Sequence, residues 1–172
     1  MPSHFPSEHC IGFHAAWHHL GGPAREGQLR MQQKMTLEEL QAFLAKEFPQ
    51  GFGPDKPNKI EAVGPGTARV RLQAGDDHLR PGGTVSGPAM MALCDATMYV
   101  AILAAIGPVA LAVTTNLSIN FLRKPESGDL IADCRLLKLG KRLAVGEVSV
   151  LAAASEEIVA HCVATYSIPP ER

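Results

Sequence analysis

The sequence is poor in charge and in aromatic rings, and neither sign of charge is in excess. Charged residues make up 19% and aromatic residues 5% of 172 positions, and 16 Lys plus Arg against 17 Asp plus Glu give a formal net charge of −1. A protein that binds nucleic acid or an anionic membrane through bulk charge needs a basic excess. We therefore expect neither as a partner. The hydrophobic content of 46% is too high for a disordered chain, and the length suits one globular domain.

Motifs that bind metals, disulfides or nucleotides are also missing. The four cysteines lie far apart, with no Cys-x-x-Cys pair: Cys10, Cys94, Cys134 and Cys162. We expect reduced thiols in a cytoplasmic protein, and neither a zinc site nor a disulfide framework. His14 and His18 are spaced to share a helix face near Cys10, but nothing fixes a third metal ligand. No glycine-rich phosphate loop occurs, so we expect no nucleotide or redox cofactor.

Charge is almost absent from one long stretch. Asp95 is the only charged residue between Arg80 and Arg123. A membrane-spanning helix needs about 20 continuous apolar residues, but Gly107 and Pro108 would interrupt this one. Beyond the interruption, polar and apolar residues alternate with a period of two, which is typical of a strand. We predict a buried helix over residues 87–106, followed by a strand, and no membrane span.

The first 34 residues differ from the rest and are predicted to lie outside the folded domain, which we place at residues 35–172. They lack the basic start and apolar core of a secretory signal peptide. Met31 and Met35 would both suit as the start of the domain. Residues 36–39 (Thr-Leu-Glu-Glu) have the pattern of a capping box, which predicts a helix from there to about residue 47.

The remaining pattern predicts an antiparallel sheet. Two short strands flank a turn at residues 64–66, and residues 75–83 read as a polar loop. Four strands are predicted after the long helix, at residues 111–123, 129–139, 142–154 and 157–168. Their short connections favour a meander. In the first of these strands the alternation puts Thr115 on the face of Leu117 and Ile119, and Thr114 on the opposite face.

A helix that is apolar on nearly every side must be covered on most of them. The simplest arrangement is an α+β fold in which a curved antiparallel sheet wraps around one long central helix. This layout resembles the hotdog-fold acyl-CoA thioesterases of the PaaI-like group, over residues 35–168. Five segments carry the resemblance, at residues 78–88, 93–95, 113–122, 128–130 and 137–143.

The resemblance implies cleavage of a thioester to a free acid and coenzyme A, with no metal or other cofactor. It also implies homodimers that assemble into a homotetramer, with active sites between subunits. The family usually has His-Gly-Gly where this chain has Ser86-Gly87-Pro88, and many members have Asn at the position of Arg80. The acidic residue of the family is retained as Asp95.

Thioester cleavage needs a water or carboxylate to attack the carbonyl, and donors for the oxyanion that forms. The first turn of a helix offers free N–H groups, and because Pro88 has none, we expect Gly87 to supply the donor. Asp95 is the predicted general base or nucleophile, and the sequence leaves both roles open. It lies about 12 Å along the helix from Gly87. We therefore expect one group from each subunit of a symmetric dimer.

Asp95 is a candidate functional residue because an isolated charge in an apolar segment is expensive to bury. Thr114, where some family members use Ser or Thr, is predicted to hold the attacking water or to hydrogen-bond Asp95. The alternative for Thr114 is an ordinary β-branched strand residue. Ser86 is either a polar contact to the substrate or the N-cap of the helix.

Coenzyme A carries several phosphate groups, for which we expect cations at the mouth of the site. By resemblance Lys141 and Arg142 are the preferred pair, with Arg80 as a further contact. The acyl group is not predicted.

Two other functions are open to a protein with this fold. Hydration of enoyl-CoA would need an Asp and a His acting together, and no His lies in the charge-free segment. An acyl-CoA-binding protein without catalysis, acting as a sensor or in assembly, is the main alternative, and Ser86 and Arg80 in place of the usual residues keep it open.

Overall fold

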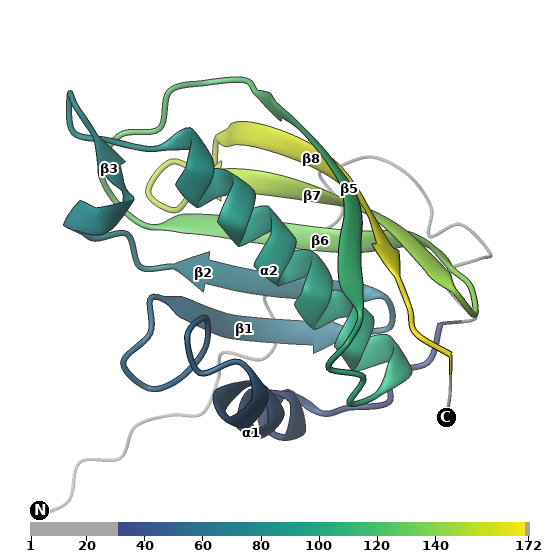
Figure 1. Cartoon of the computed structure of the whole chain (residues 1–172). Helices are drawn as coiled ribbons and strands as arrows, with labels where there is room; N and C mark the ends of the chain where they lie inside the picture. Colours follow the sequence, from purple (N-terminus) through teal and green to yellow (C-terminus); the bar gives the residue numbers. More distant parts are fainter. Residues whose placement is uncertain (1–30, 171–172) are drawn as a thin grey trace, which may run out of the picture.

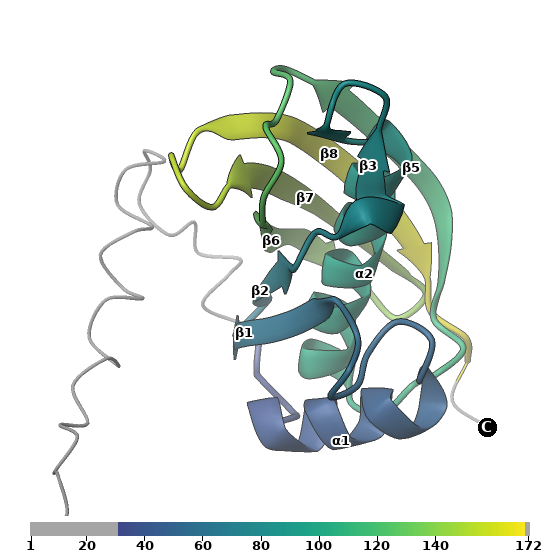
Figure 2. The same ribbon diagram turned by 90° about the vertical axis from the view of Figure 1, so that its left-hand side faces the viewer.

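The structure is a computed structural model that describes residues 31–170. Six antiparallel strands form a curved sheet with the order β1-β2-β6-β7-β8-β5, and this sheet wraps around one long helix, α2 (Figures 1 and 2). The main elements are α1 (Leu37–Glu47), β1 (Asn58–Gly64), β2 (Thr67–Leu72), α2 (Gly87–Ile106), β5 (Val113–Phe121), β6 (Leu130–Leu139), β7 (Leu143–Ala152) and β8 (Ile158–Ser167). The predicted fold class is confirmed.

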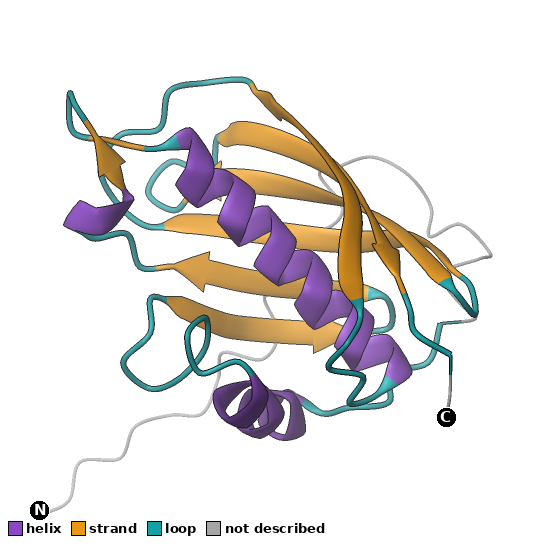
Figure 3. Ribbon diagram, in the orientation of Figure 1, coloured by secondary structure: helices purple, strands orange, loops and turns teal. Residues whose placement is uncertain are grey.

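Helix α2 lies across the inner face of the sheet (Figure 3). Its residues Met98, Ile102 and Leu103 are completely buried. By length and composition it is the one helix within residues 31–170 that could cross a membrane, but 67% of its most apolar stretch is buried inside the fold. It is therefore the core helix that the sequence predicted.

The strands alternate between an inner face, which packs against α2, and an outer face. The inner-face residues are small or aliphatic in β2, β6 and β7, for example Val70, Ala132 and Val148. Gly146 of β7 also faces the helix, where a Cβ atom would lie 2.6 Å from Sδ of Met98 and 3.0 Å from a main-chain oxygen. Here glycine permits a close approach of helix and sheet.

Helix α1 packs against the core, in contact with α2 and β1. It begins with the predicted capping box, in which Thr36 and Glu39 bond each other's main-chain N–H, and it buries Leu40 and Leu44 completely. The main-chain N–H groups of Lys34 and Met35 both donate to the carbonyl of Ala104 in α2.

The residues just before α1 contact the core. Residues 31–34 were assigned to the leader, yet Met31 packs against the core and Lys34 bonds α2. Met31 and Lys34 therefore contact the folded domain, and the boundary at residue 35 stays a prediction. The rest of the leader, with Cys10, His14 and His18, lies outside the described residues.

The predicted meander is right for β6, β7 and β8 but wrong for β5. Strand β5 pairs with β8 at the edge of the sheet, and β6 pairs with β2. The connection of eight residues between β5 and β6 can span up to about 26 Å. Crossing from β5 to β6 past β8 and β7 needs only about 14 Å. A short connection therefore did not fix which strands are neighbours.

The predicted loop at residues 75–83 also contains regular structure. A 3-10 turn, η4 (Asp76–His78), leads into a small hairpin of β3 (Leu79–Arg80) and β4 (Thr84–Val85). Gly82 and Gly83 have φ values of 96° and 70° in the turn between these strands, a region that glycine adopts at little cost. The hairpin places Nε of Arg80 3.0 Å from Oγ1 of Thr84.

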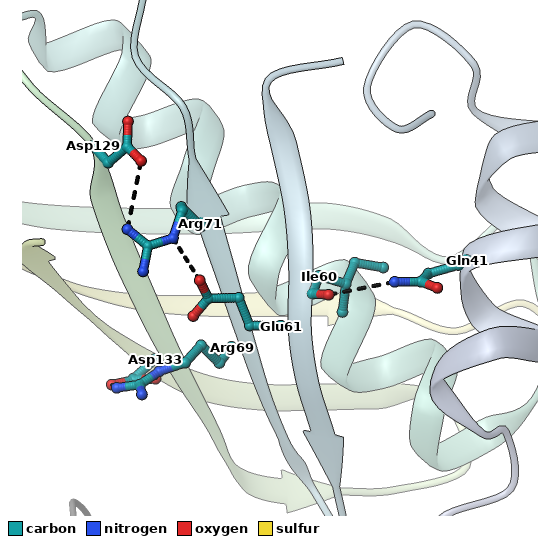
Figure 4. A network of polar contacts seen from close by, with 7 residues as sticks. All are labelled: Gln41, Ile60, Glu61, Arg69, Arg71, Asp129 and Asp133. Carbon is teal, nitrogen blue, oxygen red and sulfur yellow. Dashed lines mark hydrogen bonds and ion pairs between the residues drawn. The ribbon is translucent and has the colours of Figure 1, made fainter. Parts of the chain in front are cut away.

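The outer face of the sheet carries ion pairs between neighbouring strands (Figure 4). Arg69 makes a two-pronged contact with Asp133, at 2.7 Å and 2.6 Å. Arg71 bonds Glu61 at 2.5 Å and contacts Asp129 at 3.5 Å. Further along the same face Arg135 pairs with Glu147, which also lies 3.6 Å from His161.

Candidate active site

The first turn of α2 leaves one main-chain N–H free. Ser86 is the N-cap, and its side-chain oxygen accepts from the N–H of Ala89 at 3.3 Å while its carbonyl accepts from Met90. Pro88 has no N–H to offer. The N–H of Gly87 is thus the only donor of this turn without an acceptor in the described part of the chain.

Gly87 lines a cavity of about 310 Å³ between the β3–β4 hairpin and the segment that follows β5. Three cationic residues, Arg80, Arg123 and Lys124, also line this cavity, together with apolar residues such as Phe121. A Cβ atom on Gly87 would lie 3.3 Å from Cζ of Phe121. The cavity therefore combines a free N–H, positive charge and an apolar wall.

The carboxylate of Asp95, two turns further along α2, is held by two hydroxyl groups. Thr114 in β5 donates to Oδ1 at 2.5 Å, and Tyr166 in β8 donates to the same oxygen at 2.6 Å. Tyr166 also lies 2.9 Å from the main-chain oxygen of Asp95. Asp95 is half-buried, and no cationic side chain of residues 31–170 forms an ion pair with it.

A β-bulge brings the two hydroxyl groups together. Thr114 is the cross-strand partner of Tyr166, but Asn116 is already the partner of Thr165, so β5 has one extra residue at this point. The extra residue reverses the alternation, and Thr114 rather than Thr115 shares the inner face with the rest of the buried row. The predicted orientation was therefore wrong, whereas the predicted hydrogen bond from Thr114 to Asp95 is present.

Tyr166 was not predicted as part of the site. Burial raises its pKa, and the hydrogen bond with Asp95 raises it further, so the phenol keeps its proton and acts as a donor. Its ring stacks on that of Tyr99, with centroids 6.4 Å apart, and these are the only tyrosines of the chain. A signal was available in the sequence, since a buried tyrosine usually needs a partner for its hydroxyl.

The side of the molecule next to Asp95 is open, and it exposes apolar residues among polar ones. On α2 the residues Pro88, Met91 and Ala92 are exposed in line with Asp95. The edge strand β5 exposes Val113 and Phe121 to 54% and 49%. An unpaired apolar strand edge is a surface on which another strand can pair.

The predicted site residues fall into three places. Gly87 and Arg80 line the cavity at the start of α2, where Ser86 is the N-cap of the helix. Asp95 and Thr114 meet about 12 Å further along the helix. Lys141 and Arg142 lie in the turn between β6 and β7, at the opposite end of strands about 30 Å long. Within one chain they do not line the cavity, where Arg123 and Lys124 stand instead.

Two of the three buried cysteines are unsuited to act as nucleophiles. Cys94, Cys134 and Cys162 are free thiols. The hydrogen bond with Cys162, followed by burial, raises the pKa of Cys94, and burial raises the pKa of Cys134. These two thiols are therefore poor nucleophiles. Within residues 31–170 no group of three or more His, Cys, Asp or Glu side chains is arranged to hold a metal ion.

Comparison with known proteins gives a consistent result. Residues 82–159 match the thioesterase superfamily. A candidate thioesterase from a Silicibacter species is 46% identical, with a TM-score of 0.74, covering 84% of this chain and 97% of that one. The phenylacetic acid degradation protein PaaI from Thermus thermophilus is 26% identical, with a TM-score of 0.58, covering 65% and 93%. Zebrafish thioesterase superfamily member 2 shares the fold at 20% identity, with a TM-score of 0.68, covering 79% and 100%. No curated protein matches.

Proposed function

The chain belongs to the thioesterase superfamily, with the hotdog fold of its PaaI-like members, and on this premise we propose that it hydrolyses acyl-CoA thioesters to a free acid and coenzyme A. The family supports thioester hydrolysis in general. One observation carries the proposal for this chain: two hydroxyl groups, and no cation of residues 31–170, hold the carboxylate of Asp95 beside an open strand edge. Hydroxyl donors orient a carboxylate without forming an ion pair with it.

The free N–H of Gly87 is proposed to bind the oxygen of the thioester carbonyl. This group stands at the positive end of α2, where negative charge is stabilised. As the carbonyl carbon becomes tetrahedral, its oxygen gains negative charge, and one well-placed donor contributes about 100- to 1,000-fold in rate.

Asp95 is proposed to activate the attacking group. As a general base it takes a proton from water, whose oxygen bonds to the acyl carbon. The C–S bond then breaks, and the sulfur leaves with that proton as the thiol of coenzyme A. As a nucleophile, its own oxygen would bond to the acyl carbon and expel the thiolate, and water would then cleave the resulting anhydride. Both routes use the same carboxylate.

Because Gly87 and Asp95 are about 12 Å apart along one helix, we propose that they meet across a homodimer. The exposed apolar residues of β5 and α2 support this edge as the interface. A two-fold axis would run paired β5 strands antiparallel, so the end at Phe121 would face the partner's end at Val113. Assembly of such dimers into a homotetramer, and a cytoplasmic location, belong to the same proposal.

The phosphates of coenzyme A are proposed to bind Arg80, Arg123 and Lys124 at the cavity of Gly87. In the antiparallel dimer the turn with Lys141 and Arg142 would reach this cavity from the other subunit. The sequence-based pair thus stays in the proposal as a contribution of the second subunit.

The decisive experiment replaces Asp95 by Asn and measures thiol release from a panel of short, medium, long and aromatic acyl-CoA thioesters. We expect kcat to fall by about 100- to 10,000-fold, the usual contribution of a general base. The matched control is Asp133→Asn, the same chemical change on the outer face, which should keep its activity below its melting temperature.

Two results would contradict the proposal. One is full turnover by the Asp95→Asn protein in its native oligomeric state. The other is tight binding of acyl-CoA by the unaltered protein without any turnover, which would favour the acyl-CoA-binding alternative.

A further inference from the structure

We propose that Tyr166 is a positioning residue, which together with Thr114 fixes Oδ1 of Asp95 and leaves Oδ2 as the oxygen that acts on water or on the acyl carbon. This inference rests on the proposed function, since it assigns roles to the two oxygens of the proposed catalytic carboxylate. It gives a role in the reaction to a residue of β8, beside those proposed above for residues of α2.

The number of hydrogen bonds to each oxygen of the Asp95 carboxylate supports these roles. Each hydroxyl has one proton to donate, and both lie within 2.6 Å of Oδ1. No donor within residues 31–170 bonds Oδ2. The two oxygens of a carboxylate are chemically equivalent in water, and here the protein makes them different: one is engaged twice and the other is available.

The phenol of Tyr166 is suited to positioning because it cannot move far. The residue is 2% exposed, and its ring stacks on that of Tyr99. Thr114, in contrast, is exposed at the edge strand. A rigid donor that is ordered before the substrate binds costs no further ordering during the reaction.

The β-bulge in β5 is a second sign that the arrangement serves the site. Without the extra residue Thr115 would face α2, and Thr114 would point to the outer face. Bulges disrupt pairing and often re-aim a side chain next to active sites. Here the bulge makes Thr114 the direct cross-strand neighbour of Tyr166, so both hydroxyl groups converge on one oxygen.

A purely structural role for Tyr166 makes a different prediction. If the hydroxyl served only to satisfy its own hydrogen bonding, the main-chain oxygen of Asp95 at 2.9 Å would suffice. Its removal would then lower thermal stability and leave kcat unchanged. Positioning instead acts on the chemical step, so kcat falls and KM is unchanged.

The test is Tyr166→Phe in the full-length, assembled protein, assayed with the acyl-CoA that the unaltered protein turns over fastest. Tyr99→Phe is the matched control, because its hydroxyl donates to the carbonyl of Ala110 and not to Asp95. Loss of a hydrogen bond to a charged group predicts a fall in kcat of about 10- to 100-fold for Tyr166→Phe. We expect KM within about twofold for both variants and normal kcat for Tyr99→Phe.

Thr114 gives an independent readout. Thr114→Val should lower kcat in the same way, and Thr114→Ser, which keeps the hydroxyl, should restore most of it. Normal kcat in Tyr166→Phe, with an inactive Asp95→Asn, overturns the positioning role and leaves the proposed function intact. Normal activity in Asp95→Asn overturns both.

Discussion

Carboxylates on the outer face of the sheet and the carboxylate beside α2 are held in opposite ways. Asp133 on the outer face has a side chain only 10% exposed and meets a guanidinium group of Arg69. Asp95 is also half-buried, yet among the side chains that the structure describes only hydroxyl groups hold it. An arginine neutralises a carboxylate and locks it into the sheet, whereas two hydroxyl groups orient it and leave its charge available. The comparison separates a structural acid from one kept for chemistry.

The largest effect is expected from mixing two inactive subunits. Asp95→Asn removes the carboxylate, and Gly87→Val fills the cavity next to Phe121, where even a Cβ atom would lie 3.3 Å from the ring. If the two groups meet across a dimer, a mixed dimer has one intact site. Random pairing of equal amounts would then restore about a quarter of the original activity.

The mixture is made by co-expression, and thiol release is measured on the purified assembly. The control pairs Asp95→Asn with the double variant Gly87→Val/Asp95→Asn, for which no intact site can form. An absence of recovery in the first mixture, with mixed dimers present, would place both groups in one chain or elsewhere.

A smaller effect is expected on the outer face. Arg69→Met leaves Asp133, which is almost buried, without its guanidinium partner, and should lower the free energy of unfolding by about 2 kcal/mol. The activity should stay unchanged, because this pair lies on the face away from α2. Urea unfolding followed by circular dichroism measures the first quantity and thiol release the second.

The double variant Arg69→Met/Asp133→Leu tests whether the ion pair itself stabilises the sheet. Replacing a buried ion pair by apolar residues of similar size often restores stability, so we expect most of the loss to be regained. A double variant that is less stable than Arg69→Met would instead show that the ion pair itself stabilises the sheet.

At alkaline pH the free energy of unfolding should depend on the two tyrosines near Asp95. The pKa values of Tyr99 and Tyr166 are both raised above their ordinary value of 10, mainly by burial. At a given pH above 10 these tyrosines ionise more fully in the unfolded chain than in the folded one. Their contribution to stability is therefore complete below pH 10 and is lost as the pH rises, by up to about 1.4 kcal/mol per pH unit for each tyrosine.

The measurement is a pH titration of phenolate absorbance, in parallel with unfolding experiments. Since the chain has only these two tyrosines, the native protein should show little phenolate just above pH 10. In Tyr166→Phe the alkaline loss of stability should be shallower. Phenolate absorbance that rises over the same pH range in the folded and in the unfolded protein would contradict the argument.

Local signals made much of the fold predictable. The side chains of Thr36 and Ser86 cap α1 and α2 as such residues do at helix starts, and the period of hydrophobicity placed the four strands that follow α2 within two residues at each end. Strand order was not predictable, because it depends on contacts between distant segments. The partners of β5 and β6 follow from how the sheet closes around α2 and not from the length of their connection.

The site was predictable only in part for a similar reason. The isolated charge of Asp95 and the free N–H of Gly87 follow from the sequence alone. The bulge at Thr115 is one extra residue that no period reveals, and it decides which threonine faces Asp95. Tyr166 looked like one more member of a buried row, because the partner of its hydroxyl is 71 residues away.

The smallest effect is expected for the exposed ion pair of Arg123 and Glu157. Its atoms are 3.0 Å apart, but the two side chains are 57% and 60% exposed. Water and salt screen such a pair, so Glu157→Gln should change the free energy of unfolding by less than about 0.5 kcal/mol. The urea experiment used for Arg69→Met provides the direct comparison, and a loss as large as that of Arg69→Met would contradict the argument. Burial, and not the number of ion pairs, then decides which charges stabilise this fold. By the same criterion Asp95 is, within the described residues, the half-buried carboxylate that no cation stabilises.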